Sequence, residues 1–297
     1  MAAFLSSLVA GLAVGSVYGM IAICYTVVFS ATRVFNVAQG DIVAAGVLLA
    51  WLLLDQAHLP QVAALLLTVA AVAAVSVVEE RLLVRRFLTR GSGHATGMSV
   101  FICTLAFTII LENINSNIYG TRPLSNIPSI AGQQAIRIGS VNVSRQFLLA
   151  FGALIIVTLG LELFYKRSWL GTAMRACAED RAVAALRGID PARVSQYAFL
   201  IAGIIAGLTG FILAPIVNAD VTVGLMYGLK GFIALAVGGF GSIRGSLVGA
   251  CGLGIAEQML DLYGNSNYEI LAGLGLLLLV LSIRPAGLFG VRAERVV

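Results

Sequence analysis

Long runs of apolar residues, separated by short polar and basic stretches, dominate the pattern of this 297-residue chain. A helix needs about 20 apolar residues to cross the hydrocarbon core of a bilayer. Uninterrupted runs also favour helices over the alternating ten-residue segments of a membrane β-barrel. The runs that meet or approach this length are Phe4–Phe29, Asp41–Leu54, Gln61–Val78, Thr96–Ile118, Phe147–Tyr165, Val194–Val217, a run from Phe232 onward, Ser246–Met259 and Ile270–Ile283.

The pattern therefore predicts an all-α integral membrane protein, a polytopic helical bundle in a single transmembrane domain over residues 1–297. Asp41–Leu54 and the run around Phe232 are short, so we expect either eight or nine spans. Glycines at helical spacing let helix backbones approach closely. We expect their faces to meet helices of this chain, with another subunit as the alternative. The sets are Gly11, Gly15 and Gly19; Gly203, Gly207 and Gly210; and Gly245, Gly249 and Gly252.

Composition narrows the class of protein further. Hydrophobic residues make up 59% of the chain and charged residues 11%, with a mean hydropathy of +0.97. A soluble globular domain has about 25% charged residues. These values exclude a soluble or disordered chain, and they exclude a nucleic-acid-binding domain despite the pI of 9.2. The expected surroundings are membrane lipid.

Basic residues give the orientation, because Lys and Arg concentrate in cytoplasmic loops. Most of the 19 Lys and Arg residues fall in one set of loops, which we assign to the cytoplasm. This places the N-terminus outside and the C-terminus in the cytoplasm, provided that the stretch Gly238–Gly245 turns on the cytoplasmic side. Arg244 stays unassigned, and the opposite set of loops holds only Arg122, Arg137, Arg145 and Lys230.

The predicted outer loop, residues 119–145, contains a hairpin signal. Apolar and polar residues alternate on both sides of Gly139-Ser140, as in a β-hairpin with a type II′ turn. This ribbon serves either as a docking surface for an external partner or as a lid over helix ends, and the sequence leaves both open.

The predicted inner loop contains an alanine-rich stretch that favours helix over residues 172–187. Gly188 follows as a helix-ending residue, and Asp190-Pro191 caps the next span. We expect one short cytoplasmic helix, joined to spans at both ends, that docks on another protein; the alternative is a helix lying on the lipid. Its apolar stripe contains Met174, Cys177, Ala178, Ala182, Ala185 and Leu186.

No sequence motif for chemistry is found. Neither Lys166 nor Lys230 lies in a phosphate-binding G-x-x-x-x-G-K-[ST] motif, so no nucleotide site is expected. The four cysteines and two histidines have no metal-binding spacing, and no nucleophile motif occurs. We therefore expect no catalytic residue, no metal and no cofactor on this chain.

Polar residues within apolar runs are the remaining candidates for a translocation path, since such groups usually face a cavity or a partner helix. Hydrogen bonding between helices is the competing explanation. One group lies at the inner end of the second span and the other towards the outer end of the fourth; they are Asn36, Gln39 and Asp41, and Glu112, Asn113, Asn115 and Asn117.

Four motifs, in order, resemble a known family. The stretch N-V-A-Q-G at Asn36–Gly40 is similar to N-F-A-H-G, and Arg175–Asp180 with Gly188-Ile189 is similar to a cytoplasmic coupling region. Gly238–Gly245 matches G-G-x-G-S-x-x-G, and Arg284–Gly290 matches R-P-x-G. Along nearly its whole length the chain resembles LivH-type permeases of branched-chain amino-acid ABC importers. Val37 and Gln39 depart from the family pattern, which bears on the solute, since related permeases carry urea, amides or organic acids.

The resemblance implies a multi-pass permease of the cell inner membrane that transports branched-chain amino acids or a related small amphipathic solute. It implies four kinds of partner: a second, LivM-like permease, two cytoplasmic ATPases that bind ATP and Mg, an external solute-binding protein, and lipid. The residues implied in coupling to the ATPases are Arg175, Glu179, Asp180, Gly188 and Asp190. The alternative function is an ion-coupled secondary carrier that uses an intramembrane acid such as Glu112.

Overall fold

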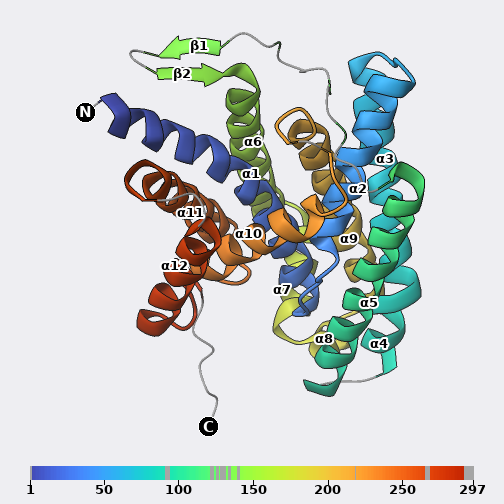
Figure 1. The fold of residues 1–297 in the computed structure, drawn as a ribbon. Helices are drawn as coiled ribbons and strands as arrows, with labels where there is room; N and C mark the ends of the chain where they lie inside the picture. The colour runs from blue at the N-terminus through green and yellow to red at the C-terminus, as the bar shows by residue number, and fades with distance from the viewer. Residues whose placement is uncertain are drawn as a thin grey trace.

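The computed structural model describes residues 2–90, 94–120, 124, 127, 132, 135–138, 141–217, 219–264 and 268–290, which form helices and one small antiparallel sheet (Figure 1). Two π-helical turns, η1 and η2, continue α-helices without a break. The elements in chain order are α1 (Ala2–Thr32), α2 (Gln39–Trp51), η1 (Leu52–Gln56), α3 (Gln61–Glu79), η2 (Glu80–Val84), α4 (Arg85–Arg90), α5 (His94–Tyr119), β1 (Ala135–Ile138), β2 (Val141–Ser144), α6 (Arg145–Arg167), α7 (Trp169–Glu179), α8 (Arg181–Leu186), α9 (Pro191–Leu213), α10 (Val223–Gly238), α11 (Ile243–Tyr263) and α12 (Glu269–Ile283).

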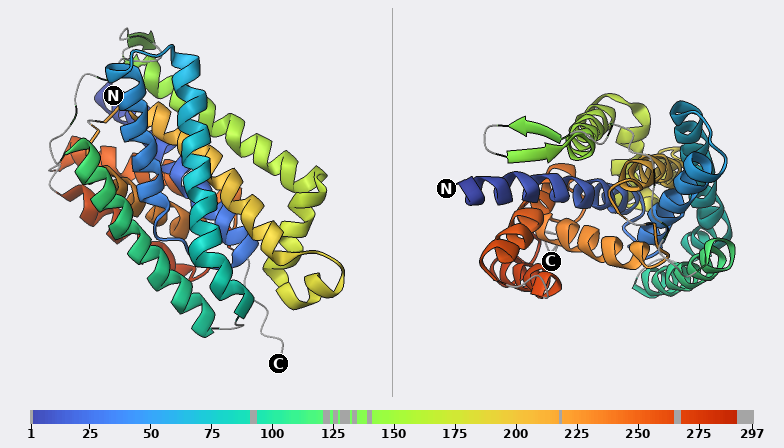
Figure 2. Two further views of the ribbon diagram at one scale, coloured as in Figure 1. Left: turned by 90° about the vertical axis from the view of Figure 1, so that its right-hand side faces the viewer. Right: turned by 45° about the horizontal axis from the view of Figure 1, so that its top comes forward.

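Helix α1 is the central element of the bundle. It enters at the edge of the molecule and runs into its middle, against α6, α9, α10 and α11 (Figure 2). Every residue from Gly15 to Val28 is buried. A helix that is apolar on all sides is stable only when neighbours cover all of it, which explains the central position.

The number of membrane-spanning helices is close to the expected eight or nine. Within the described residues, six helical segments are long and apolar enough to cross a membrane, and a seventh arises if the bent pair α10 and α11 forms one span. These two helices meet at an angle of 117°. Helix α12 is an apolar helix of 15 residues and is shorter than a full span. The expected number is therefore approximate, because α10 and α11 together count as at most one span and α12 is shorter than the minimum of about 17 residues.

The π-helical turns lengthen two of the predicted spans. Residues Leu52–Gln56 extend α2 to an 18-residue segment, so the short predicted span is continuous. Residues Glu80–Val84 extend α3 to a 27-residue segment that ends at Phe87. As a result Glu79 and Glu80, which lie outside the predicted span ending at Val78, are fully buried within a helix.

The glycine-lined faces mostly meet helices of the same chain, as expected. Gly15 packs against Ala250 of α11, and a Cβ at Gly15 would lie 2.7 Å from the Ala250 carbonyl oxygen. Gly203 and Gly207 pack against α3 in the same way. Gly252 is an exception, since nothing lies within 4 Å of a Cβ built there.

The predicted hairpin is confirmed by the antiparallel pairing of β1 with β2, in which Ala135 faces Ser144 and Ile138 faces Val141. Ser144 also caps α6 by accepting a hydrogen bond from the Gln146 backbone N–H. Gly139 and Ser140, and with them the expected turn type, lie outside the described residues, as does much of the 119–145 loop.

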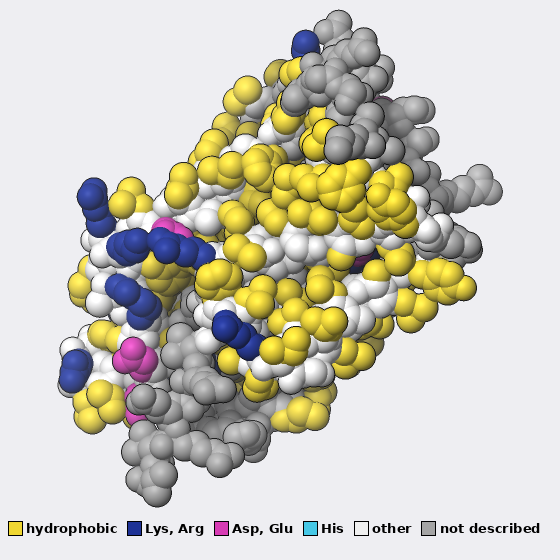
Figure 3. Space-filling model, turned by 90° about the vertical axis from the view of Figure 1, so that its left-hand side faces the viewer, with side chains coloured by type: hydrophobic (Ala, Val, Ile, Leu, Met, Phe, Trp, Pro, Cys, Tyr) yellow, Lys and Arg dark blue, Asp and Glu magenta, His cyan; other side chains and the backbone are white. Residues whose placement is uncertain are grey.

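The outer surface of the molecule is suited to lipid. On the face shown in Figure 3, hydrophobic side chains cover a broad area, and most of the visible Lys and Arg side chains gather to one side of it. Exposed aliphatic residues lie along α6, including Ile156 and Leu159, which are 72% and 62% exposed. This arrangement is the one expected for a membrane-embedded bundle.

Candidate functional site

The predicted cytoplasmic helix is two helices rather than one. Helix α7 ends at Glu179 and α8 begins at Arg181, with Asp180 in an extended conformation between them (φ −151°, ψ 115°). The Asp180 carboxylate accepts hydrogen bonds from the backbone N–H groups of Ala182 and Val183, at 2.7 and 3.0 Å. A single helix over residues 172–187 is therefore wrong, because Asp180 acts as an N-cap and starts a new helix.

The end of this segment agrees with the prediction. Gly188 has φ +81°. The Gly188 and Ile189 N–H groups donate to the carbonyls of Ala185 and Ala184, at 3.0 and 3.1 Å, as in a Schellman motif. Asp190 caps α9 by accepting from the N–H groups of Ala192 and Arg193, and Pro191 occupies the first turn.

The break at Asp180 also changes which residues face outward. Met174 and Cys177 of α7 are buried, as expected for the apolar stripe. On α8, however, Ala182 and Ala185 are exposed, and Leu186 is 88% exposed. Val183 is 46% exposed and Glu179 is also exposed. The stripe prediction fails beyond Asp180 because the new helix starts with a different rotational phase, which leaves Val183 and Leu186 uncovered.

Two arginines attach α7 to the rest of the bundle. Arg33 follows α1 with φ 56°, and its Nε donates to the Ala178 carbonyl at 2.9 Å. Arg175, one of the predicted coupling residues, donates from Nη2 to the Tyr165 carbonyl of α6 at 2.8 Å. The Tyr165 hydroxyl in turn lies 2.6 Å from Ser30 Oγ of α1. The ends of α1 and α6 are therefore both fixed to α7.

Arg181 attaches α8 to α9 and faces the extension of α3. Its Nη2 donates to the Pro191 carbonyl at 3.2 Å, and its charge interacts with that of the fully buried Glu80. Burial lowers the pKa of the Arg181 guanidinium, and it raises the pKa of the neighbouring Cys177 thiol. The sequence analysis did not identify Arg181 or Glu80 as candidate site residues. The available signal was the pair of adjacent acids, Glu79 and Glu80, at the end of an apolar run.

Asn36 and Gln39 lie in a buried network with an acid that the sequence did not single out. Asn36 Nδ2 donates to Glu79 Oε2 at 3.0 Å and to Gln39 Oε1 at 3.4 Å. The Val37 N–H donates to Thr104 Oγ1 of α5 at 3.2 Å. These bonds hold the non-helical segment between α1 and α2 against α3 and α5, as expected for buried polar groups in a membrane.

The second predicted group does not gather around a single point. Glu112, Asn113 and Asn117 of α5 are exposed, and Asn115 is buried. The Asn113 and Asn117 amides donate to backbone carbonyls of their own helix, at Ile109 and Asn113. The structure therefore does not join these four residues to Asn36 and Gln39.

A cavity of 340 Å³ lies between α1, α2, α5 and α10. Its wall is mainly aromatic and aliphatic, and Asp41 is the acidic residue in its lining. Tyr25 stacks on Phe35 with ring centroids 5.0 Å apart, and Phe35 meets the edge of Phe232 at 4.9 Å. The cavity has the size and lining of a small-molecule site.

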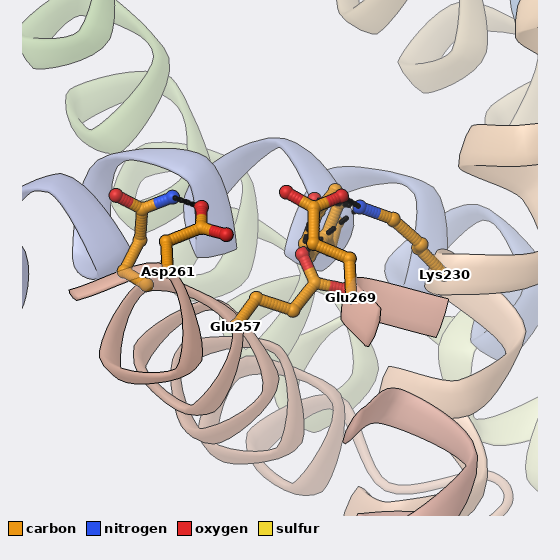
Figure 4. A network of polar contacts seen from close by, with 6 residues as sticks. Lys230, Glu257, Asp261 and Glu269 are labelled. Carbon is orange, nitrogen blue, oxygen red and sulfur yellow. Dashed lines mark hydrogen bonds and ion pairs between the residues drawn. The ribbon is translucent and has the colours of Figure 1, made fainter. Parts of the chain in front are cut away.

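A charged network joins four helices, α1, α10, α11 and α12. Lys230 of α10 pairs with Glu257 of α11 at 3.0 Å and with Glu269 of α12 at 3.1 Å (Figure 4). Its Nζ also donates to the Tyr18 hydroxyl at 2.8 Å, and that hydroxyl donates to Glu257 at 2.7 Å. Sequence reasoning assigned Lys230 to an outer loop and missed the network, because its members are far apart in the chain.

Comparison with known proteins gives consistent matches over almost the whole chain. The family described as branched-chain amino acid transport system / permease component matches residues 7–281. The high-affinity branched-chain amino acid transport system permease protein LivH of Escherichia coli (strain K12) is 31% identical over 295 residues, which cover 97% of this chain and 96% of that protein. The corresponding protein BraD of Pseudomonas aeruginosa is 32% identical over 305 residues, with the same coverage.

A solved structure, PsaBC from Streptococcus pneumoniae in complex with Fab, is also similar. It has a TM-score of 0.49 and 15% sequence identity, and the match covers 96% of this chain and 93% of that chain.

Proposed function

The chain belongs to the family of branched-chain amino-acid transport permeases, and on that premise we propose that it forms one half of the solute path of an importer whose work is done by separate ATPases. The family consists of permease components, which favours this function over an ion-coupled carrier. The chain is accordingly a multi-pass permease of the inner membrane.

The attachment of α7 and α8 to the bundle is the observation that carries the proposal. The sequence has no phosphate-binding motif, so ATP and Mg are bound by partner subunits. A movement imposed on α7 and α8 reaches α1 through Arg33 and reaches α9 through Arg181. The exposed side chains of Glu179, Val183 and Leu186 supply the contact for an ATPase.

The remaining partners follow from the same premise. A second permease chain, of the LivM kind or a copy of this one, completes the path. An external solute-binding protein docks on the opposite end, where the β1–β2 hairpin lies. The N-terminus is then outside and the C-terminus in the cytoplasm, in agreement with the distribution of basic residues. Closure of the ATPase pair would move α7 and α8 and open the path toward the cytoplasm.

Reconstituted transport tests the proposal. The complete transporter is placed in liposomes with ATP inside and solute-loaded binding protein outside, and solute uptake and ATP hydrolysis are measured together. Three variants weaken the α7–α8 linkage: Glu179→Lys, Gly188→Leu and Arg181→Met. Each should lower uptake by about tenfold while hydrolysis continues, within the usual range of coupling between sites.

The control is Tyr263→Ala, at the far end of α11, where the side chain is 75% exposed. It should leave uptake unchanged. Solute uptake at the unmodified level in all three variants would overturn the proposed role of α7 and α8, and the absence of ATP-dependent uptake by the unmodified transporter would overturn the function itself.

A further inference from the structure

A polar cavity of 360 Å³ lies at the end of the bundle that carries α7. Its volume falls within the range of small-molecule sites, about 300–1,000 Å³. The lining residues come from α1, α6, α7, α11 and the turn before α11. Three of the lining side chains are basic, Lys166, Arg175 and Arg244, and one, Glu162, is acidic. The lining therefore carries an excess of positive charge.

The basic side chains keep hydrogen-bond donors available for an anion. Arg244 donates to Glu162 from Nε and Nη2, at 2.5 and 2.9 Å. Lys166 lies 3.8 Å from the same carboxylate, which is beyond hydrogen-bonding distance. The Arg175 guanidinium donates to the Tyr165 carbonyl, and among the described residues no carboxylate pairs with it. A single carboxylate thus faces three cations, so the lining attracts a further anion.

The start of α11 adds to the attraction for an anion. Ser242 is the N-cap of this 21-residue helix, and Gly241, Ser242 and Ile243 belong to the cavity lining. The first turn of a helix presents backbone N–H groups and the positive end of the helix dipole. Guanidinium groups bind phosphate through paired N–H donors. The combination of arginines, a lysine and a helix start is therefore suited to a phosphate group.

An exposed apolar stripe on α6 leads to the same cavity and indicates which kind of molecule supplies the phosphate. Four residues share one face of this helix, at spacings of four, three and four: Ile155, Leu159, Glu162 and Lys166. Ile155 and Leu159 are 38% and 62% exposed, in a segment long and apolar enough to cross a membrane. Over the last turns of α6 this face changes from apolar side chains to charged ones, as at the edge of a bilayer.

Helix α11 has the same arrangement on its exposed face. Val248 and Gly252 follow Arg244 at spacings of four; Val248 is 40% exposed, and nothing lies within 4 Å of a Cβ built at Gly252. Trp169, the first residue of α7, is 71% exposed, and tryptophan is enriched where membrane meets water. On the face shown in Figure 3, basic side chains adjoin a broad hydrophobic area. The cavity therefore lies at the level of lipid headgroups, with surface for acyl chains beside it.

We propose that this cavity binds the phosphate of an anionic phospholipid, such as phosphatidylglycerol, whose acyl chains lie along Ile155 and Leu159 of α6 and Val248 of α11. An acidic side chain of an ATPase would match the charge but would make no use of the apolar stripe. A zwitterionic lipid has the same phosphate, but it also has an ammonium group, which the basic lining repels. In the orientation given above, the lipid belongs to the cytoplasmic leaflet. The inference concerns a lipid rather than the solute, so it does not depend on the proposed function.

The first test measures lipid binding to the delipidated full-length chain by native mass spectrometry, with phosphatidylglycerol and phosphatidylcholine of identical acyl chains. Phosphatidylglycerol should bind at least about tenfold more tightly, and Lys166→Gln should weaken its binding by about fivefold, since each basic residue near a membrane surface contributes about 1 kcal/mol. Glu162→Gln should instead strengthen the binding, a gain that misfolding would not produce. The matched control is Arg193→Gln, which should leave the binding unchanged. Arg193 is 77% exposed and pairs with Asp190 outside the cavity.

The second test locates the lipid without changing a charged residue. Phosphatidylglycerol with a diazirine in its acyl chain is added to the complete transporter in liposomes, and labelled peptides are identified after illumination. The α6 peptide with Ile155 and Leu159 should be labelled more strongly than α12, whose Leu278 is 67% exposed and serves as the lipid-facing control. The same diazirine on phosphatidylcholine should label the two helices to a similar extent.

Several outcomes would overturn the inference. Equal affinity for the two lipids, no effect of Lys166→Gln and Glu162→Gln, or an equal loss in Arg193→Gln would each contradict a specific site. Displacement of the lipid by an equal concentration of inorganic phosphate would show a site for free phosphate instead. Labelling of α6 in the isolated chain but not in the complete transporter would assign the cavity to an ATPase side chain. In each case ATP-driven solute uptake by the unmodified transporter would leave the proposed function standing.

Discussion

At the scale of single residues, Lys230 is the centre of a charged network that joins α1, α10, α11 and α12. Its ammonium group faces two carboxylates and the Tyr18 ring, whose centroid is 5.0 Å away. The Lys230 side chain is 14% exposed and that of Glu257 only 2%, while Glu269 is 36% exposed. Glu257 therefore depends on Lys230 more than Glu269 does, because Glu257 is the more deeply buried of the two carboxylates.

We predict that Lys230→Met lowers the thermal stability of the purified protein. Removing one partner of a buried ion pair costs about 3–5 kcal/mol, because the remaining charge is buried without compensation. Thermal unfolding in detergent, followed by tryptophan fluorescence, measures the effect. Adding Glu257→Gln to Lys230→Met should restore part of the loss.

Lys166→Met is the matched control for Lys230→Met. Lys166 pairs with Glu162 at 3.8 Å, and its side chain is 64% exposed. Exposed pairs contribute about 0–1 kcal/mol, so this change should have little effect. Equal loss of stability in the two variants would show that the Lys230 network is not a buried charge pair of the kind described.

The contact between α1 and α11 is the main packing feature at the scale of elements. The two helices approach so closely that a Cβ at Gly254 would lie 2.6 Å from the Gly15 backbone nitrogen. Two turns earlier, the Thr26 hydroxyl meets the Ser246 hydroxyl at 2.5 Å. Small residues along this line let the backbones touch, which is how helices associate in lipid.

Gly254→Ala should destabilise the protein, and Gly252→Ala in the same helix should not. An added methyl group in a filled contact typically costs about 1–3 kcal/mol, because backbones must move apart. At Gly252 nothing lies within 4 Å of the added carbon, so alanine meets open space there. The midpoint of thermal unfolding of the two variants gives the comparison, and an equal midpoint for both would contradict the close α1–α11 contact.

Local sequence signals predicted some elements well and others poorly. Gly188, Asp190 and Pro191 act on backbone groups two to four residues away, so their positions alone fixed the end of α8 and the start of α9. Asp180 also acts locally, but the alanines on both sides favour helix and concealed the break. The pairing of Lys230 with Glu257 and Glu269 depends on how α10, α11 and α12 pack, and no pattern within one segment contains that information.

The residues of the candidate sites were likewise predicted only in part from the sequence. Asn36, Gln39 and Asp41 were recognised as polar residues in an apolar run, but Glu79, the partner of Asn36, was not. The apolar run of α3 ends in two acids, and the sequence gives no sign that a π-helical turn carries the helix past them. Burial of these acids follows from the packing of α3 on α9, which only the assembled bundle defines.

At the scale of the whole molecule, the position of the turn between α10 and α11 bears on how the protein is oriented in the membrane. Arg244, at the start of α11, donates to Glu162 near the end of α6 at 2.9 Å. The turn between α10 and α11 therefore lies at the same end of the bundle as α7. The orientation predicted from the basic residues requires the stretch Gly238–Gly245 to turn at the same end as the other basic loops. With the turn at this end, the basic residues give one consistent orientation.

Cysteine labelling in whole cells checks the orientation. A cysteine in place of Tyr263, which is 75% exposed at the far end of α11, should react with a membrane-impermeant maleimide in intact cells. A cysteine in place of Leu186, which is 88% exposed on α8, should react only after the membrane is permeabilised. The reverse pattern would place the N-terminus in the cytoplasm, against the positive-inside assignment.

The interruption at Asp180 has a mechanical consequence. A single straight helix would transmit a force along one axis. Helices α7 and α8 instead meet at a bend, and each contacts a different part of the bundle. Helix α7 is hydrogen-bonded to the ends of α1 and α6, and α8 is hydrogen-bonded to the start of α9. We expect a single movement imposed at this bend to act on both parts of the bundle at once. It can then rotate α1 and α6 relative to α9.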